Sequence, residues 1–151
     1  MGIKKLEEVD ASFMRELDEF EQLFSLKIDN VVVDIKSLAE FRKLGLADYV
    51  VGFSTPQKHL ITIVEQNESG RDPIEWRKVL VHELVHIFYT KKFRNDKPLW
   101  FNEGLACYLA GQKKKDVPIT LKGLLDKFSE CDKDCYAFGY NVFVKLLGEQ
   151  K

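Results

Sequence analysis

The sequence lacks the features that mark membrane proteins, disulfide scaffolds and nucleic-acid binders. No apolar run approaches the length of a membrane span. The three cysteines are an odd number and define no disulfide framework, so we expect reduced thiols. Lys and Arg (23) nearly balance Asp and Glu (24), which leaves no basic signature for nucleic acid. We therefore expect no membrane partner and no nucleic-acid partner.

The first ten residues, MGIKKLEEVD, also lack the apolar segment of a secretory signal. Together with the expected reduced thiols, this favours a cytoplasmic protein. A chain of 151 residues with 45% hydrophobic residues is long enough for one core. We expect a single domain over residues 1–151.

Histidine is scarce too, and two of the three histidines stand in one motif, His82-Glu83-Leu84-Val85-His86. Side chains four residues apart lie on one face of an α-helix, where two imidazoles can hold Zn²⁺ and Glu83 can act as a base. The surrounding run, residues 79–90, is apolar nearly all round and predicts a buried helix. A hydrogen-bonded pair of core histidines is the alternative. Burying such polar groups costs free energy unless they are paired or bind a metal.

The pattern of the chain predicts an α+β fold with a small sheet packed on the motif helix. The N-terminal part, residues 1–28, reads as one amphipathic helix over Lys4–Leu26. The middle part, residues 30–91, contains strands at Asn30–Ile35, Tyr49–Phe53 and His59–Gln66, a helix over Leu38–Leu44 capped by Ser37, and the motif helix over Ile74–Lys91 capped by Asp72. If His59–Gln66 is an edge strand, it could bind an extended peptide by strand addition.

The remaining part, residues 98–151, reads as helical. Pro98 and Gly111 bracket a helix that is rich in small residues and carries Glu103 in its first turn. Catalytic zinc takes three protein ligands, so Glu103 is the natural third ligand. Residues 113–115 read as a solvated basic loop, and Ile119–Ser129 as a helix capped at Thr120.

The segments His82–His86 (HELVH) and Trp100–Ala106 (WFNEGLA) resemble the gluzincin metallopeptidases, whose third zinc ligand lies on a following glutamate helix. The resemblance implies a zincin-like fold, with a mostly antiparallel sheet on the active-site helix and a helical C-terminal part. It also extends to Tyr136–Gly139 (YAFG), which is similar to the family's Y-x-x-G segment. By that resemblance Tyr136 is the candidate donor to the oxyanion, and Tyr140 is the fallback.

Three departures refine the resemblance. The close spacing of the motifs is similar to that of the single-domain minigluzincins. The G-x-M-E-N motif, by which the aminopeptidases grip a free amino end, is absent, which favours an endopeptidase. Cys107 stands where thermolysin-like relatives carry an aspartate that orients a zinc-binding histidine.

These observations predict a peptidase that holds one Zn²⁺ per chain through His82, His86 and Glu103 and acts on a peptide or protein substrate. Glu83 would be the general base. One alternative is a latent or inactive zinc protein, with its cleft blocked by the C-terminal residues 148–151 or by a thiolate from Cys131 or Cys135. The simpler interpretation of those cysteines is two free thiols. The other alternative is a regulatory peptidase dedicated to one protein substrate.

Overall fold

The computed structural model describes residues 2–131 and 134–149. Its strands are β1 (Gly2–Lys5), β2 (Val32–Lys36), β3 (Gly52–Thr55) and β4 (Leu60–Val64). Its α-helices are α1 (Leu6–Val9), α2 (Phe13–Phe24), α3 (Leu38–Arg42), α4 (Pro73–Phe93), α5 (Leu99–Ala110), α6 (Leu121–Asp126) and α7 (Asp134–Leu147). Two short 3₁₀ helices, η1 (Pro56–Lys58) and η2 (Gln66–Glu68), flank β4. None of the helices in the described ranges is long and apolar enough to cross a bilayer.

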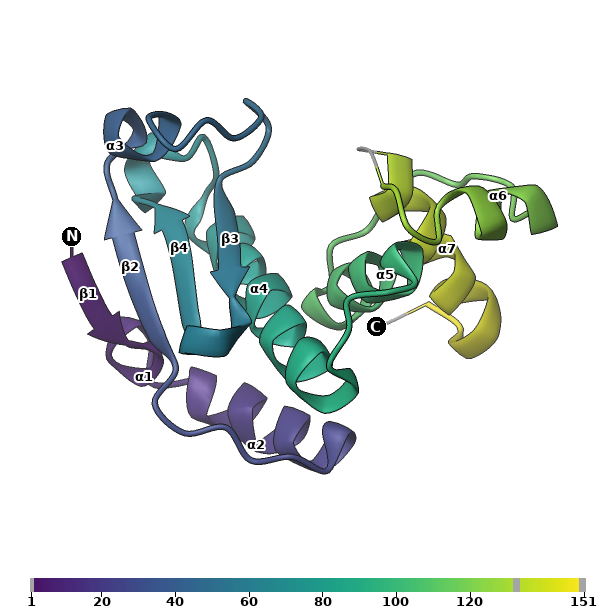
Figure 1. Cartoon of the computed structure of the whole chain (residues 1–151). Coiled ribbons are helices and arrows are strands. Elements are labelled where there is room, and N and C mark those ends of the chain that lie inside the picture. Colours follow the sequence, from purple (N-terminus) through teal and green to yellow (C-terminus); the bar gives the residue numbers. More distant parts are fainter. Residues whose placement is uncertain (1, 132–133, 150–151) are drawn as a thin grey trace.

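The four strands form one mixed sheet in the order β1-β2-β4-β3 (Figure 1). The β1–β2 and β3–β4 pairs are antiparallel, and the central β2–β4 pair is parallel. The α+β prediction is confirmed. The strand that precedes the motif helix, β4, lies inside the sheet, so the condition for strand addition is not met there. The edge strands are β1 and β3.

The prediction of one helix over Lys4–Leu26 is wrong. Residues 2–5 form β1, because their backbone pairs with β2, from Gly2 opposite Ile35 to Lys5 opposite Val32. The remainder is broken between α1 and α2, where the Asp10 carboxylate accepts a hydrogen bond from the Ser12 backbone at 2.9 Å. This local bond competes with a continuous helix.

The predicted caps of the middle part are confirmed, although the strand boundaries differ by a few residues. The Ser37 side chain accepts a hydrogen bond from the Glu40 backbone at the start of α3. The Asp72 carboxylate accepts one from the Glu75 backbone at 2.8 Å, with Pro73 as the first residue of α4. These bonds satisfy orphan donors at each helix start.

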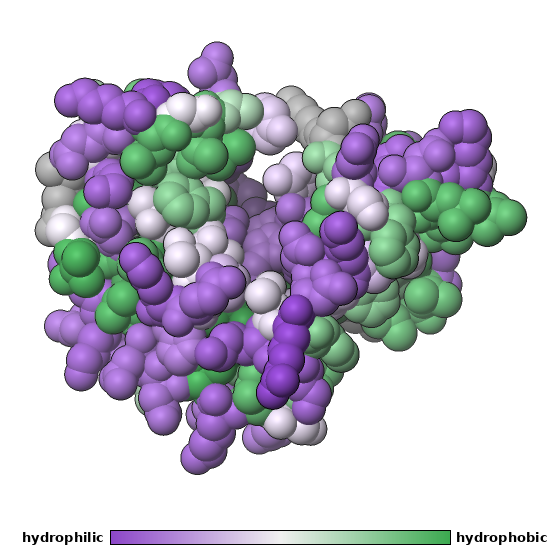
Figure 2. Space-filling view, viewed as in Figure 1, coloured by the Kyte–Doolittle hydropathy of each residue, from purple (hydrophilic) through white to green (hydrophobic). Residues whose placement is uncertain are grey.

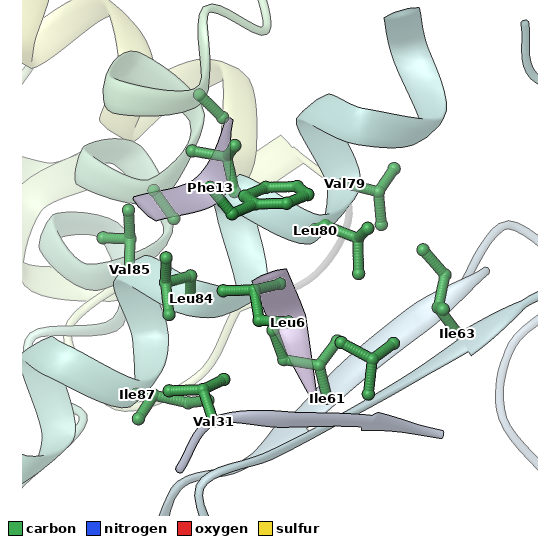
Figure 3. Packing of buried hydrophobic residues seen from close by; sticks show 14 of the residues in the cluster. Leu6, Phe13, Val31, Ile61, Ile63, Val79, Leu80, Leu84, Val85 and Ile87 are labelled. Atoms are coloured by element: carbon green, nitrogen blue, oxygen red, sulfur yellow. The ribbon is translucent and has the colours of Figure 1, made fainter. Parts of the chain in front are cut away.

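Helix α4 is the centre of the molecule. Its first turn is tied to the sheet by Trp76, whose indole N–H donates to the Val64 carbonyl at 2.7 Å. Figure 3 shows Leu80 and Leu84 of α4 facing Ile61 of β4 in one apolar cluster that also takes in Leu6 and Phe13 from the N-terminal part. Burying these side chains stabilises the fold by about 1.5–3 kcal/mol each.

The C-terminal helices pack beside α4, with α5 next to α4 and α7 against α5 (Figure 1). Glycines allow this close approach: a Cβ added to Gly104 of α5 would lie 2.3 Å from the backbone carbon of Gly139 in α7. The predicted helix over Ile119–Ser129 is present as the shorter α6, with its cap at Thr120 confirmed.

The expectation of free thiols at Cys131 and Cys135 is wrong, because the structure joins them in a disulfide. Their Cα atoms are 5.3 Å apart where the chain enters α7, which is within the range a disulfide spans. Cys107 is the free cysteine of the described chain, and it is buried. Neither thiol of the pair is therefore available as a zinc ligand.

Candidate metal centre

His82 and His86 lie on one face of α4, with their ring centroids 4.7 Å apart. The two Nε2 atoms are separated by 3.0 Å. The helix is continuous and buried at this point, so the i, i+4 spacing brings both rings to the same place.

Glu103 of α5 completes a cluster of three potential ligands. Its Oε1 atom lies 3.2 Å from His82 Nε2 and 2.7 Å from His86 Nε2. The sequence predicted Glu103 in the first turn of its helix. Because α5 begins at Leu99, Glu103 lies in the second turn instead.

The spacing of these atoms fits a metal ion. Ligands on a tetrahedral zinc with bonds of 2.0–2.1 Å are roughly 3.3 Å apart. The ligand atoms here are separated by 2.7–3.2 Å, so a slight outward shift would admit the ion. Two imidazoles and one carboxylate are a donor set that zinc accepts, although other first-row divalent metals accept it as well.

Amide side chains orient both imidazoles. His82 Nδ1–H donates to the Gln112 Oε1 atom at 2.7 Å, and His86 Nδ1–H donates to the Asn102 Oδ1 atom at 2.7 Å. These bonds place a proton on Nδ1 of each ring, so Nε2 is the atom that each ring presents to a metal ion or, when protonated, to the Glu103 carboxylate. Such partners fix the ring and its tautomer in histidine metal sites.

The sequence interpretation missed both amide residues. Asn102 carried a signal, since it is a polar residue in an apolar helix immediately before Glu103. Gln112 carried none, because it follows the end of α5 and reaches His82 only through the fold. Cys107 Sγ also contacts His82 Nδ1, at 3.7 Å, which is within the longer range of a sulfur hydrogen bond. The bond to Gln112 is shorter, so Gln112 is the main partner that orients the His82 ring.

The charges of the cluster suit metal binding. Burial opposes ionisation of Glu103, but the charge of His86 and hydrogen bonds from both histidines hold the pKa of this carboxyl well below its usual range. Burial also opposes protonation of His86, but the neighbouring Glu103 carboxylate raises its pKa overall. A metal ion must therefore displace protons from the histidines, whereas the carboxylate of Glu103 is already deprotonated.

Glu83, between the two histidines in sequence, points toward the sheet edge. It is 8% exposed, and burial raises its pKa. The charges of the two histidines and a hydrogen bond from the side chain of Ser54 in β3 oppose that rise. A buried carboxylate with a raised pKa beside a metal site has the character of a general base.

Tyr136, in the first turn of α7, reaches the same place. Its ring centroid lies 5.9 Å from that of His82. Burial raises its pKa, and the nearby Glu103 and Glu83 carboxylates raise it further, so the hydroxyl stays protonated as a donor. Tyr140 packs in an apolar cluster with Tyr108 and Phe143 and does not line the cavity next to the histidines, whereas Tyr136 does. The structure therefore favours Tyr136 over Tyr140 as the tyrosine of the site.

A cavity of about 600 Å³ opens beside these residues. Its lining includes His82 and Glu83 of α4, Tyr136 of α7 and the residues that lead into β3, from Tyr49 to Gly52. Figure 2 shows the molecule hollowed between the sheet part and the C-terminal helices. The volume is typical of sites for small ligands or a few residues of a peptide.

The C-terminal segment that was predicted as a plug, residues 148–151, is described only at its first two residues. Gly148 lies outside the cavity, where its carbonyl accepts a hydrogen bond from Tyr108 at 2.6 Å. Residues 150 and 151, the end of the predicted plug, lie outside the described residues.

Comparison with known proteins assigns no family to the chain. No protein-family model matches it, and no solved structure matches it significantly. What the structure defines is an α+β fold with a possible metal-binding group of two histidines and one glutamate.

Proposed function

We propose that this protein is a zinc-dependent peptidase of the gluzincin type with a zincin-like fold. The observation that carries the proposal is the meeting of His82, His86 and Glu103, from two helices, beside the buried carboxylate of Glu83. A metal-binding protein without catalysis would have no use for that carboxylate. The cavity next to it provides room for a substrate.

In the proposed mechanism, His82, His86 and Glu103 would hold the ion. Bound zinc would lower the pKa of a water molecule and polarise the carbonyl of the substrate. Glu83 accepts the proton of the attacking water and then delivers it to the leaving amine. The Tyr136 hydroxyl donates a hydrogen bond to the developing oxyanion.

The substrate would lie along β3 as an added strand. This strand is one of the two edges of the sheet, and its start lines the cavity. An edge strand offers unpaired backbone donors and acceptors to an extended peptide. Ser54 on the same strand contacts Glu83, which would set the peptide bond close to the base.

The test compares two substitutions on an unstructured protein such as casein. Glu83→Gln should keep zinc and lose cleavage, whereas His82→Ala should lose both. Cleavage by Glu83→Gln at the wild-type rate would remove the proposed general base.

A further inference from the structure

The cavity beside the metal centre has basic side chains on its walls. Arg71 lies on the loop before α4, and Lys114 and Lys115 lie on the loop after α5; all three line the cavity. Apart from Glu83, the acidic residue of the lining is Asp134. The cations therefore outnumber the acids around the space that a substrate would fill.

Both loops are held in place by side-chain hydrogen bonds. Gln66 donates to the Arg71 carbonyl at 2.6 Å, and Ser69 accepts from the Arg71 backbone at 3.2 Å. On the other wall, the buried Asn141 of α7 donates to the Lys115 carbonyl at 2.8 Å. The basic residues thus stand on fixed backbone.

Lys114 lies near a residue of the proposed catalytic site. Its Nζ atom lies 5.9 Å from the ring centroid of Tyr136, the proposed oxyanion donor. In the part of the chain that the structure describes, the ion pairs of lysine and arginine involve other residues: Lys36, Arg77, Lys78 and Lys122. The charges of the three cavity residues are therefore available to a ligand.

We propose that the cavity selects substrates with a carboxylate close to the scissile bond, and that Arg71, Lys114 and Lys115 provide this selectivity. The inference rests on the proposed function, since it concerns the peptide held at the same site. The carboxylate comes from an Asp or Glu side chain or from a free C-terminus. Complementary charge in a cleft steers a ligand and rejects one of the opposite sign.

The test measures binding to the zinc-loaded Glu83→Gln protein, which does not consume the probe. The probes are short N-acetylated, C-terminally amidated peptides of Ala, Gly and Ser. Each peptide in the series carries a single Glu at a different position. Matching peptides carry Gln or Lys in place of that Glu. One neutral peptide with a free C-terminal carboxylate is added to distinguish the two sources.

At one position the Glu peptide should bind about tenfold tighter than the Gln peptide, which corresponds to about 1.4 kcal/mol of binding free energy. The Lys peptide should bind more weakly than the Gln peptide, because the basic cavity attracts a carboxylate and repels an ammonium group. Tighter binding of the free-acid peptide than of its amide would instead assign the C-terminus as the source. Raising the salt concentration should reduce the preference.

The matched substitutions are Lys114→Glu and Lys113→Glu. Both residues are exposed on the same loop, but Lys113 does not line the cavity. Lys114→Glu, alone or with Arg71→Glu, should abolish the preference, and Lys113→Glu should preserve it. Equal loss in both variants, equal binding of Glu and Gln peptides, or no binding of any peptide would overturn the inference.

Cleavage of the same peptides by the wild-type protein separates this inference from the proposed function. Selective binding without cleavage supports the carboxylate site and contradicts the peptidase. Equal cleavage of the Glu, Gln and Lys peptides supports the peptidase and contradicts the carboxylate site.

Discussion

At the residue scale, the two histidines depend on amide side chains that are neutral acceptors. Metal-binding histidines are commonly oriented by a carboxylate, a backbone carbonyl or water, and a carboxylate raises the basicity of the ring. Gln112 and Asn102 fix the ring and its tautomer without adding charge. The three groups that would hold an ion therefore supply a single formal negative charge, that of Glu103.

Removing one amide should weaken metal binding. Gln112→Ala should lower zinc affinity roughly 10–100-fold, because His82 loses the partner that fixes its ring. Gln112→Glu should bind zinc at least as tightly as the wild-type protein, because a carboxylate can accept the same hydrogen bond from His82. Competition with a chromophoric chelator measures the effect, and Lys113→Ala on the next residue is the control. Unchanged affinity in Gln112→Ala would show that packing alone orients His82.

The contact between Ser54 and Glu83 predicts a shift in the pH profile. The base acts when deprotonated, so kcat/KM should fall as the pH drops through the pKa of Glu83. The Ser54 hydrogen bond lowers that pKa. Ser54→Ala should therefore move the acid limb of the kcat/KM profile to higher pH. A limb that stays in place would mean that another group controls it.

At the scale of elements, the crossing of α5 and α7 sets the position of Glu103. The two helices touch through Gly104 and Gly139, where a Cβ on either residue would meet backbone atoms of the other helix. Backbone cannot move aside as a flexible side chain can, so the contact fixes the distance between the helix axes.

Gly104→Ala should push α5 away from α7. Glu103, the residue before Gly104, should then move relative to His82 and His86. We expect a loss of about 1–3 kcal/mol in the free energy of unfolding, as for other overpacked sites, together with weaker zinc binding. Gly45→Ala is the control, because Gly45 has open space and a positive φ of 81°. It should cost about 1–2 kcal/mol of backbone strain and leave zinc affinity unchanged. Denaturant unfolding and zinc titration give both quantities, and full zinc affinity in Gly104→Ala would contradict the account.

The elements also show what the sequence could predict. Helix α4 was predictable because Asp72, Pro73 and the dense apolar pattern are local signals. Strand β1 was not, because its exposed residues become a strand only by pairing with β2. The same limit applies to the site. The motifs identified His82, His86 and Glu103, whereas Gln112 and Ser54 reach the site only through tertiary contacts.

At the scale of the whole molecule, the candidate metal centre connects the sheet part to the C-terminal helices. His82 and His86 belong to the helix that packs on the sheet, and Glu103 belongs to the helix that packs on α7. An ion held by all three would fasten the two sides of the cavity to each other.

Zinc should therefore stabilise the folded chain. At a free zinc concentration 100 times the Kd, the free energy of unfolding should rise by about 2.7 kcal/mol if the unfolded chain does not bind the metal. Thermal unfolding with zinc and with a chelator measures this difference. Glu103→Ala should abolish it. A zinc effect of equal size in Glu103→Ala would place the ion elsewhere.

The most direct test of the central claim is the cleavage rate of an unstructured protein as zinc is added to the metal-free chain. We predict that the rate rises with zinc and reaches a plateau at one equivalent per chain, and that Glu83→Gln binds the same equivalent without cleavage. Binding of zinc without cleavage by the wild-type chain would contradict the peptidase. Failure to bind zinc would contradict the metal centre itself.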